Sequence, residues 1–343
     1  MRVLGIETSC DETSVALLEH TENQLKLEAH LVASQLEHHR PYGGVVPEVA
    51  TRQHLKQLDP MVDRILKSQG RSLEDVDLIA VTQGPGLASS LMVGFCYAQG
   101  LALASSISVL GINHMEGHLF SPFLSHNCAP VFPHLSLIVS GGHTMLVYVK
   151  EPWNYKIIGR TRDDAVGEAF DKVAKLLGLA YPGGPEVEKR AQMGDDQRYA
   201  FPRSMLHSGD YAFSLSGLKT SVRYALQKQD KVTASTINDF CASFQKAVID
   251  VLVGKTEKAI HSLGVKTLTL SGGVSCNRTL ADALERMCRQ SDVRFLGTIP
   301  EFSTDNAAMI AYAAALRERD QVSSMNKGLD IDPNWQLDAC SAL

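Results

Sequence analysis

The chain has 343 residues, of which 44% are hydrophobic and 21% charged, and its formal net charge is −5. At roughly 150 residues per domain this length predicts two domains or one duplicated unit, and the composition excludes disordered, collagen-like and low-complexity chains. The acidic balance excludes a protein that holds nucleic acid by overall basic charge alone, so such a partner would need a local basic patch or a helper protein.

Export and membrane insertion are not expected. The N-terminus reaches acidic residues within its first dozen positions and lacks the long apolar run of a signal peptide. Residues 78–115 contain no Lys, Arg, Asp or Glu, but Gly84, Pro85 and Gly86 interrupt them, so we interpret this stretch as buried core. The seven cysteines are scattered and never spaced C-x-x-C, which is typical of a reducing compartment and predicts a cytoplasmic protein.

Hydrophobic periodicity predicts alternating strands and helices in two similar series. The first series has strands at residues 2–8, 14–19 and 25–33, a helix at 53–69, a strand at 78–82, a helix at 89–104 and a strand at 109–113. The second has strands at residues 135–139, 144–150 and 155–160, helices at 165–177 and 233–263, a strand at 267–270, a helix at 277–289, a strand at 294–296 and a helix at 306–317.

A three-stranded meander followed by alternating helices and strands, present twice, predicts two mixed α/β lobes that face each other across a cleft. This α/β pattern resembles the duplicated ribonuclease-H-like fold of actin, sugar kinases and heat-shock ATPases. We expect one lobe from residues 1–112 with about 306–343, and another from 113–305. Residues 178–232 read as an insertion carrying loops, and the tail from residue 326 as surface-packed coil.

Three turns that follow predicted strands, at residues 7–13, 140–143 and 271–274, have the composition of anion-binding turns. Glycine in the last two lets backbone N–H groups approach phosphate oxygens, and the third leads toward a helix whose amino end favours anions. The alternative is that they are only tight turns. None matches a P-loop or a well-placed dinucleotide fingerprint.

Two histidines indicate a metal site. His114 and His118 are four residues apart, so on a helix they share one face and can reach one ion; the alternative is local packing. Glu116 lies midway between them, which does not fit either common zinc-protease motif. Asp305 is the best remaining carboxylate, although an Asp before a helix is usually a cap. Two histidines with a carboxylate would suit ferrous iron or zinc.

Acidic residues also flank helices and loops of the second half. Asp163, Asp164 and the run at residues 167–172 read as helix-capping or solvated acids. Residues 181–185, Tyr-Pro-Gly-Gly-Pro, form an unusual loop followed by Glu186 and Glu188, and a buried acid there could bind ribose hydroxyls.

Ten motifs, taken in order, resemble the TsaD family of tRNA N6-adenosine threonylcarbamoyltransferases, once labelled O-sialoglycoprotein endopeptidases. They are IETSCDET (6–13), YGGVVPE (42–48), GPGL (84–87), HMEGH (114–118), SGGHT (140–144), GEAFDK (167–172), YPGGP (181–185), SGLKT (216–220), SGGV (271–274) and STDN (303–306). The resemblance implies the actin-like ATPase (ASKHA) fold and covers essentially the whole chain.

The resemblance also implies an acyltransferase. Its reaction would move the L-threonylcarbamoyl group from threonylcarbamoyl-adenylate to N6 of the adenosine just 3′ of the anticodon, in tRNAs that read codons beginning with A. His114, His118 and Asp305 fall on the family's metal ligands, with Fe²⁺ as the first expectation and Zn²⁺ as the alternative. The expected adenylate-binding residues are Ile138, Val139, Ser140, Gly141, Gly142, Asp171, Gly184 and Asn277. Glu188 is an expected ribose contact, and Glu12 an acid near the reacting centre.

Departures from the family pattern are small. Asn113 and Ser303 stand where relatives often carry His and Cys, and Cys276 replaces a common Ala. The expected partners are tRNA, a paralogous TsaB-like subunit, a TsaE-like ATPase and an upstream TsaC-like adenylate synthase, with no membrane. The alternatives are a metalloprotease, an ATP-binding kinase or chaperone, and a scaffold without catalysis.

Overall fold

The computed structural model describes residues 1–21, 25–320 and 330–341. The chain divides into two compact units, Met1–Pro130 with Thr304–Leu343, and Val131–Ser303. The lobe boundary expected near residue 112 lies elsewhere in this division. Helix α4 (His114–Ser125) stays with the first unit because it packs against α11 (Ala307–Arg319).

The first unit is built on a mixed five-stranded sheet with the order β3-β2-β1-β4-β5. β1 pairs antiparallel with β2, and β2 pairs antiparallel with β3; β1, β4 and β5 run parallel. The strands are β1 (Arg2–Glu7), β2 (Glu12–His20), β3 (Leu25–Ser34), β4 (Leu78–Gly84) and β5 (Ser108–Asn113). All five lie where the hydrophobic pattern predicted strands.

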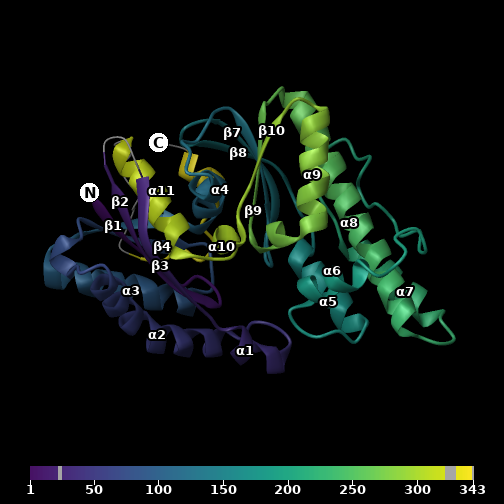
Figure 1. Cartoon of the computed structure of the whole chain (residues 1–343), viewed down its shortest axis with the longest axis horizontal. Coiled ribbons are helices and arrows are strands. Elements are labelled where there is room, and N and C mark those ends of the chain that lie inside the picture. The colour runs from purple at the N-terminus through teal and green to yellow at the C-terminus, as the bar shows by residue number, and fades with distance from the viewer. Residues whose placement is uncertain (22–24, 321–329, 342–343) are drawn as a thin grey trace. The chain divides into compact units, whose positions relative to one another are not determined.

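Helices cover both faces of this sheet (Figure 1). α2 (Pro47–Ser68) and α3 (Ala88–Ser105) share a core with alternate residues of β1, β2 and β4. α11 lies on the opposite face, where a Cβ at Gly5 of β1 would come 2.4 Å from the Ala307 carbonyl oxygen. Successive strand residues point to opposite faces of a sheet. Leu4 and Ile6 therefore point toward α2 and α3, whereas Gly5 faces α11, and its missing side chain lets that helix approach the strand closely.

The second unit repeats this topology. Read from β8, its strand order is β8-β7-β6-β9-β10, which matches the order of the first sheet strand for strand. The strands are β6 (His134–Val139), β7 (Thr144–Glu151), β8 (Asn154–Arg160), β9 (Thr267–Ser271) and β10 (Arg294–Gly297). The helices are α5 (Val166–Leu176), α6 (Gly183–Ala191), α7 (Ser216–Gln227), α8 (Ala234–Leu263), α9 (Arg278–Gln290) and α10 (Pro300–Ser303). The prediction of a duplicated ribonuclease-H-like unit is confirmed.

Three expectations need correction. Residues 178–232 are not only loops, because they contain α6 and α7; α6 begins at Gly183 directly after Pro182, and proline and glycine at a helix start hid it. α2 begins at Pro47, six residues before the apolar stripe indicated, since proline is favoured in the first helical turn. A four-residue helix, α1 (Leu36–His39), was not expected at all.

The apolar stretch at residues 78–115 is core only in part. β4 is buried throughout, whereas α3 keeps a solvent-facing side on which Leu103 is 88% exposed. Within the described residues α3 is the one helix long and apolar enough to cross a membrane. It packs against α2 and β4, with Leu91 and Phe95 buried, as the core helix of a folded unit does.

The described part of the C-terminal tail lies against the first unit. Asp332 donates its backbone N–H to the Gln83 carbonyl oxygen at 2.9 Å, and Asn113 donates its side-chain N–H to the Trp335 carbonyl oxygen at 3.1 Å. The tail is coil that ends in a short 3-10 helix at Leu337–Ser341, so the expectation of surface-packed coil holds for residues 330–336. Residues 326–329 and 342–343 lie outside the described residues.

Candidate metal centre and nucleotide pocket

Two histidines and one aspartate of the first unit converge on one point. His114 is the first residue of α4, His118 lies about one turn later on the same face, and Asp305 precedes α11. Asp305 Oδ1 lies 3.4 Å from His114 Nε2 and 3.1 Å from His118 Nε2. One ligand atom from each of the three residues lies within 4.8 Å of the other two, so the cluster can hold a metal ion.

Asp305 is not a helix cap. The cap of α11 is Asn306, whose Oδ1 accepts a hydrogen bond from the Met309 backbone N–H at 3.0 Å. Asp305 directs its carboxylate at the histidines instead, which removes the main alternative that the sequence left open. Burial by itself raises the pKa of Asp305, but the charge of His114 and the hydrogen bonds of both histidines hold that pKa well below its usual range.

Glu7 supports the cluster from behind His114. Its Oε2 lies 3.1 Å from His114 Nδ1, the ring nitrogen that faces away from Asp305. A buried carboxylate in this place fixes the ring orientation and makes Nε2 a better metal ligand, as in carboxylate–histidine–metal triads. Burial lowers the pKa of His114, but Asp305 and Glu7 outweigh it and raise the pKa well above its usual value. This supporting acid is the chemical evidence that the donor set fits a metal.

Glu12 stands at the start of β2, close to this cluster. Partial burial, together with the charges of Asp11 and Asp305, raises the pKa of its carboxyl well above its usual range. Perturbed carboxyls of this kind are typical of functional sites.

Glu116 does not belong to the metal centre. Its carboxylate is fully buried and forms an ion pair with Arg317 of α11, with 3.1 Å between Oε2 and Nε. A metalloprotease would need an acid free to act on a metal-bound water, and Glu116 is committed to Arg317. The protease alternative therefore loses its candidate base.

The second unit contains a pocket of about 170 Å³, where four of the expected adenylate-binding residues meet the expected ribose contact. Gly141, Asp171, Gly184, Glu188 and Asn277 all line it, together with Gly167, Phe170, Pro182, Pro185, Gly273, Val274 and Cys276. The other expected contacts are not among the described lining residues. Ile138 and Val139 are buried in β6, and Ser140 and Gly142 belong to the turn between β6 and β7.

Glycine is required where this turn meets α5. A Cβ on Gly167 would come 2.8 Å from the Gly141 Cα and 2.9 Å from the Ser140 carbonyl oxygen. The third glycine turn leads toward α9, as expected, and a 3-10 helix at Gly273–Cys276, which the sequence pattern did not indicate, lies between them. The Ser140–His143 turn is closed by a 2.8 Å backbone hydrogen bond, so it is a tight hairpin that also borders the pocket.

Three polar residues of the pocket, Asp171, Glu188 and Asn277, already form hydrogen bonds with other residues of the second unit. Asp171 Oδ1 accepts the Gly183 N–H at 2.7 Å, which fixes the start of α6, and Glu188 Oε1 accepts the Arg278 N–H at 2.8 Å. Asn277 caps α9 through its Oδ1, which accepts the Leu280 N–H at 2.9 Å. The side-chain nitrogen of Asn277 donates to Gln245 Oε1 at 2.8 Å.

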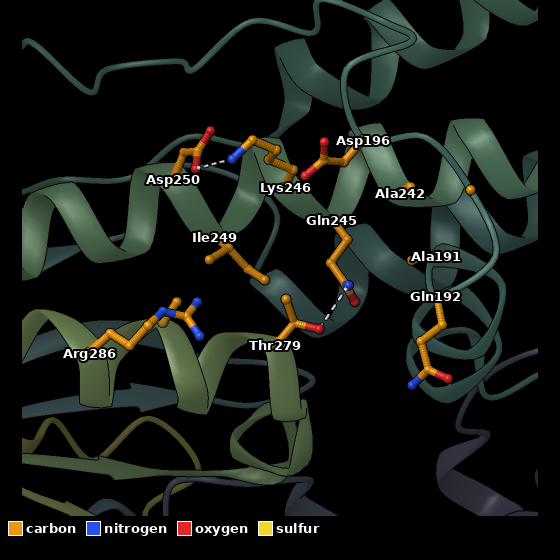
Figure 2. A pocket seen from close by; sticks show the side chains of 12 residues that line it. Ala191, Gln192, Asp196, Ala242, Gln245, Lys246, Ile249, Asp250, Thr279 and Arg286 are labelled. Carbon is orange, nitrogen blue, oxygen red and sulfur yellow. Dashed lines mark hydrogen bonds and ion pairs between the residues drawn. The ribbon is translucent and has the colours of Figure 1, made fainter.

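Gln245 joins the nucleotide pocket to a second one. Figure 2 shows Gln245 of α8 bonded to Thr279 of α9, with 3.2 Å between Nε2 and Oγ1, in a pocket of about 360 Å³. Gln192 lines the same pocket and has its own side chain well away from this bond (Figure 2). Because Gln245 donates to Thr279 and accepts from the side-chain nitrogen of Asn277, it fixes the orientation of the Asn277 amide.

Sequence reasoning missed Glu7 and Gln245. In the sequence Glu7 looks like a polar residue at the end of a strand. The polar turn that follows it was the only signal of a functional role. Gln245 lies in the middle of a long helix and carries no signal of its own. None of the seven cysteines, all of which lie in the described part of the chain, forms a disulfide bond; they include Cys10 near the metal centre and Cys276 at the pocket.

Comparison with solved structures supports the fold. The chain superposes on HypF of T. kodakarensis with a TM-score of 0.62 at 13% identity, over 94% of this chain and 48% of HypF. It superposes on the activator of 2-hydroxyisocaproyl-CoA dehydratase from Clostridium difficile with a TM-score of 0.51 at 14% identity, over 95% and 99% of the two chains. These likenesses show the duplicated actin-like ATPase fold and nothing finer.

Comparison of sequences shows the family. The family model described as TsaD, tRNA N6-adenosine threonylcarbamoyltransferase, matches residues 26–312. A protein of that name from Polaromonas sp. strain JS666 is 45% identical over 340 residues, which cover 98% of either chain. The resemblance that ten short motifs indicated thus extends through the whole length. The chain belongs to the TsaD family of tRNA N6-adenosine threonylcarbamoyltransferases.

Proposed function

We propose that this protein transfers the L-threonylcarbamoyl group from threonylcarbamoyl-adenylate to N6 of adenosine 37 in tRNAs that read codons beginning with A, with release of AMP. The observation that carries the proposal is the 45% identity to a named threonylcarbamoyltransferase over 98% of both chains. The cluster of His114, His118 and Asp305 supports it, because the site has the donor set of a catalytic metal centre with ligand positions left open.

The reaction balances as an acyl transfer. N6 of the adenosine attacks the carbonyl carbon of the threonylcarbamoyl group and forms a C–N bond. The bond between that carbon and the phosphate oxygen breaks, and AMP leaves with the electron pair. N6 loses one proton. An anticodon-loop adenosine is single-stranded, so presenting its amine costs less unstacking than flipping a base out of a duplex.

In the first unit, His114, His118 and Asp305 would hold one divalent metal, Fe²⁺ or Zn²⁺. When bound, the metal would supply Lewis-acid stabilisation of the negative charge that develops on substrate oxygens. Glu7 keeps His114 oriented for this task. We assign Glu12 to accept the proton of N6, because its carboxyl lies at the start of β2 within electrostatic reach of the metal ligand Asp305.

In the second unit, the pocket of Gly141, Asp171, Gly184, Glu188 and Asn277 would bind the adenylate. Glycine turns allow backbone N–H groups to approach the phosphate. Glu188 uses Oε1 for the Arg278 N–H, and its other carboxylate oxygen can accept a ribose hydroxyl. We extend the proposal to Ile138, Val139, Ser140 and Gly142, which form the carboxyl end of β6 and the turn after it, where Gly141 lines this pocket.

Binding of tRNA depends largely on basic contacts to its phosphates, and this chain has a net charge of −5. We therefore propose that partner proteins supply part of the tRNA-binding surface. We propose that a paralogous TsaB-like subunit and a TsaE-like ATPase work with this chain in the cytoplasm. A TsaC-like enzyme would make the adenylate from threonine, bicarbonate and ATP.

The test is threonylcarbamoyl transfer to an unmodified tRNA with the adenylate-forming enzyme and both partner proteins supplied. Wild type is compared with His118→Ala and, as a matched control, with His126→Ala, an exposed histidine directly after the same helix. The readouts are the modified nucleoside by mass spectrometry and AMP release. Metal content is measured on each protein.

Wild type and His126→Ala should both form product, whereas His118→Ala should lose metal and activity together. Product from all three proteins, with no metal bound to His118→Ala, would remove the metal from the mechanism and leave the transferase. No product from any of them, with a known enzyme of this family active in the same mixture, would reject the transferase itself.

A further inference from the structure

The turn between β1 and β2 carries residues 8–11 and ends at Glu12, and it is held by its backbone carbonyls. Three consecutive carbonyl oxygens accept hydrogen bonds from three different places. The Ser9 oxygen accepts the Leu87 N–H at 2.8 Å, and the Asp11 oxygen accepts the Gln35 N–H at 3.1 Å. The Cys10 oxygen, in the middle, is bonded to Nε2 of His54 at 3.0 Å.

His54 is the only side chain among these three donors, and it belongs to α2. A carbonyl oxygen can only accept, so Nε2 of His54 carries the proton and Nδ1 is left as an acceptor. Thr13 Oγ1 lies 2.8 Å from Nδ1, and Gln35 Nε2 lies 3.2 Å from it. Gln35 Nε2 also faces the Ala50 carbonyl oxygen at 3.4 Å, which confirms that the nitrogen of this amide points to His54.

The bonds continue on the other side of Gln35. Its Oε1 lies 3.3 Å from Nε2 of His39, and Nδ1 of His39 accepts the backbone N–H of Val46 at 3.2 Å. Each donor in this series points toward the turn. The order is Val46 N–H to His39, His39 to Gln35, Gln35 to His54, and His54 to the Cys10 oxygen.

The series is buried and fully paired. Gln35, His39 and His54 are each at most 2% exposed, and burial lowers the pKa of both histidines, in keeping with the neutral rings that the donor pattern requires. A buried polar network with every group satisfied is rigid and admits one arrangement. Its outer end is the motif YGGVVPE at residues 42–48, where Tyr42 is 63% exposed.

We propose that His54, Gln35 and His39 are positioning residues: their one-way chain of hydrogen bonds runs from Val46 in the YGGVVPE motif to the Cys10 carbonyl and holds the turn that places Glu12 for the transfer reaction. This inference deepens the proposed function. It gives the motif at 42–48, which supplies no residue to the metal centre or the nucleotide pocket, a task at the reacting turn.

The test compares His54→Leu, His54→Gln, His39→Leu and a matched control, His38→Leu, the exposed neighbour of His39 in α1. Glutamine keeps a donor nitrogen in the place of Nε2. The first readout does not depend on activity: site-resolved alkylation of Cys10, measured by mass spectrometry on the metal-loaded protein. Exposed Cys96 is the internal reference, and buried Cys340 reports general unfolding of the same unit.

We expect Cys10 alkylation relative to Cys96 to rise about fivefold or more in His54→Leu and by less in His39→Leu, because local opening of the turn becomes easier. Cys340 should stay protected, and His54→Gln and His38→Leu should match wild type. In the transfer assay kcat of His54→Leu should fall by up to about 100-fold with KM for the adenylate unchanged, as expected when a reacting group is misplaced.

Cys10 protection and kcat equal to wild type in both His54→Leu and His39→Leu would overturn the proposal. Should His54→Leu alkylate at Cys340 as well, it is unfolded, and the comparison of His39→Leu with His54→Gln decides. Wild-type protection of Cys10 and wild-type kcat in a folded His39→Leu would then show that the chain of bonds does not reach the turn. Absence of transfer by wild type would reject the proposed function, while the alkylation pattern would still test the turn.

Discussion

Glu7 and His114 form a buried pair in which the carboxylate oxygen Oε2 lies 3.1 Å from Nδ1 of the imidazole. Glu7 also accepts hydrogen bonds from the Thr82 hydroxyl and the Ser9 backbone N–H. The carboxylate is therefore fixed on its own side before it fixes the histidine. Such a pair sets the tautomer that leaves Nε2 of His114 free to bind a metal.

Glu7→Gln is expected to weaken metal binding by about 10- to 100-fold, the usual cost of losing the carboxylate behind a histidine ligand. Glutamine has nearly the same shape, so the loss comes from charge and not from a cavity. Metal affinity is measured by competition with a chelator. Glu19→Gln, at the far end of β2, is the control and should bind metal like wild type. If Glu7→Gln bound metal as tightly as wild type and Glu19→Gln, Glu7 would have no part in the metal centre.

The metal-free protein should lose stability as the pH rises above neutrality. The pKa of His114 is raised well above its unfolded value of about 6.5, so the stability from protonated His114 is complete below that pH and is lost as the pH rises through the raised pKa. The pKa values of Asp305 and Glu7 are lowered, so their contribution is present above about pH 4 and is lost as the pH falls through the lowered values.

Thermal unfolding of chelator-treated protein between about pH 6 and pH 9 measures this effect, with His114→Gln as the variant that cannot titrate. We expect the Tm of wild type to fall across this range more steeply than that of His114→Gln. Metal-loaded protein should show the opposite trend in metal affinity, because the ion competes with the proton for His114. Parallel Tm curves for the two metal-free proteins would contradict the assignment.

Arg317→Met should destabilise the first unit by about 3–5 kcal/mol, because it leaves the fully buried Glu116 carboxylate without its partner. The double variant Glu116→Gln with Arg317→Met should recover much of this loss. Denaturant unfolding measures both. If Glu116 were the base of a protease, Glu116→Gln alone would abolish peptide hydrolysis at temperatures well below the Tm of the variant. We expect the transfer activity of Glu116→Gln to persist at those temperatures.

Gln245→Leu should raise the KM for the adenylate about tenfold, as the Asn277 amide nitrogen loses its buried acceptor. Binding of the adenylate to isolated protein and steady-state KM both measure it. Gln192→Leu is the matched control, since Gln192 lines the same pocket of Figure 2 without a bond to Asn277. A wild-type KM in Gln245→Leu would show that the amide of Asn277 needs no orientation.

The repeated series of strands could be predicted because a half-buried strand has alternating apolar residues and a fully buried strand has a continuous apolar run, and both patterns are visible in the sequence. The histidines could be predicted for a similar reason: spacing on one helix fixes a shared face. Asp305 stayed ambiguous, since a cap and a ligand look alike before a helix, and only the structure shows that Asn306 takes the cap. Glu7, Gln245 and His54 could not be found, because each acts through a contact with a residue at least 32 positions away.

The distance along the chain between His118 and Asp305 has a consequence for biosynthesis. These two residues are 187 positions apart, and the whole of the second unit, Val131–Ser303, is synthesised between them. A ribosome that has finished the two histidines has not yet made the third ligand. The metal centre can therefore be completed only when nearly the entire protein has left the ribosome, so a truncated product that ends within the second unit cannot retain the ion through all three residues.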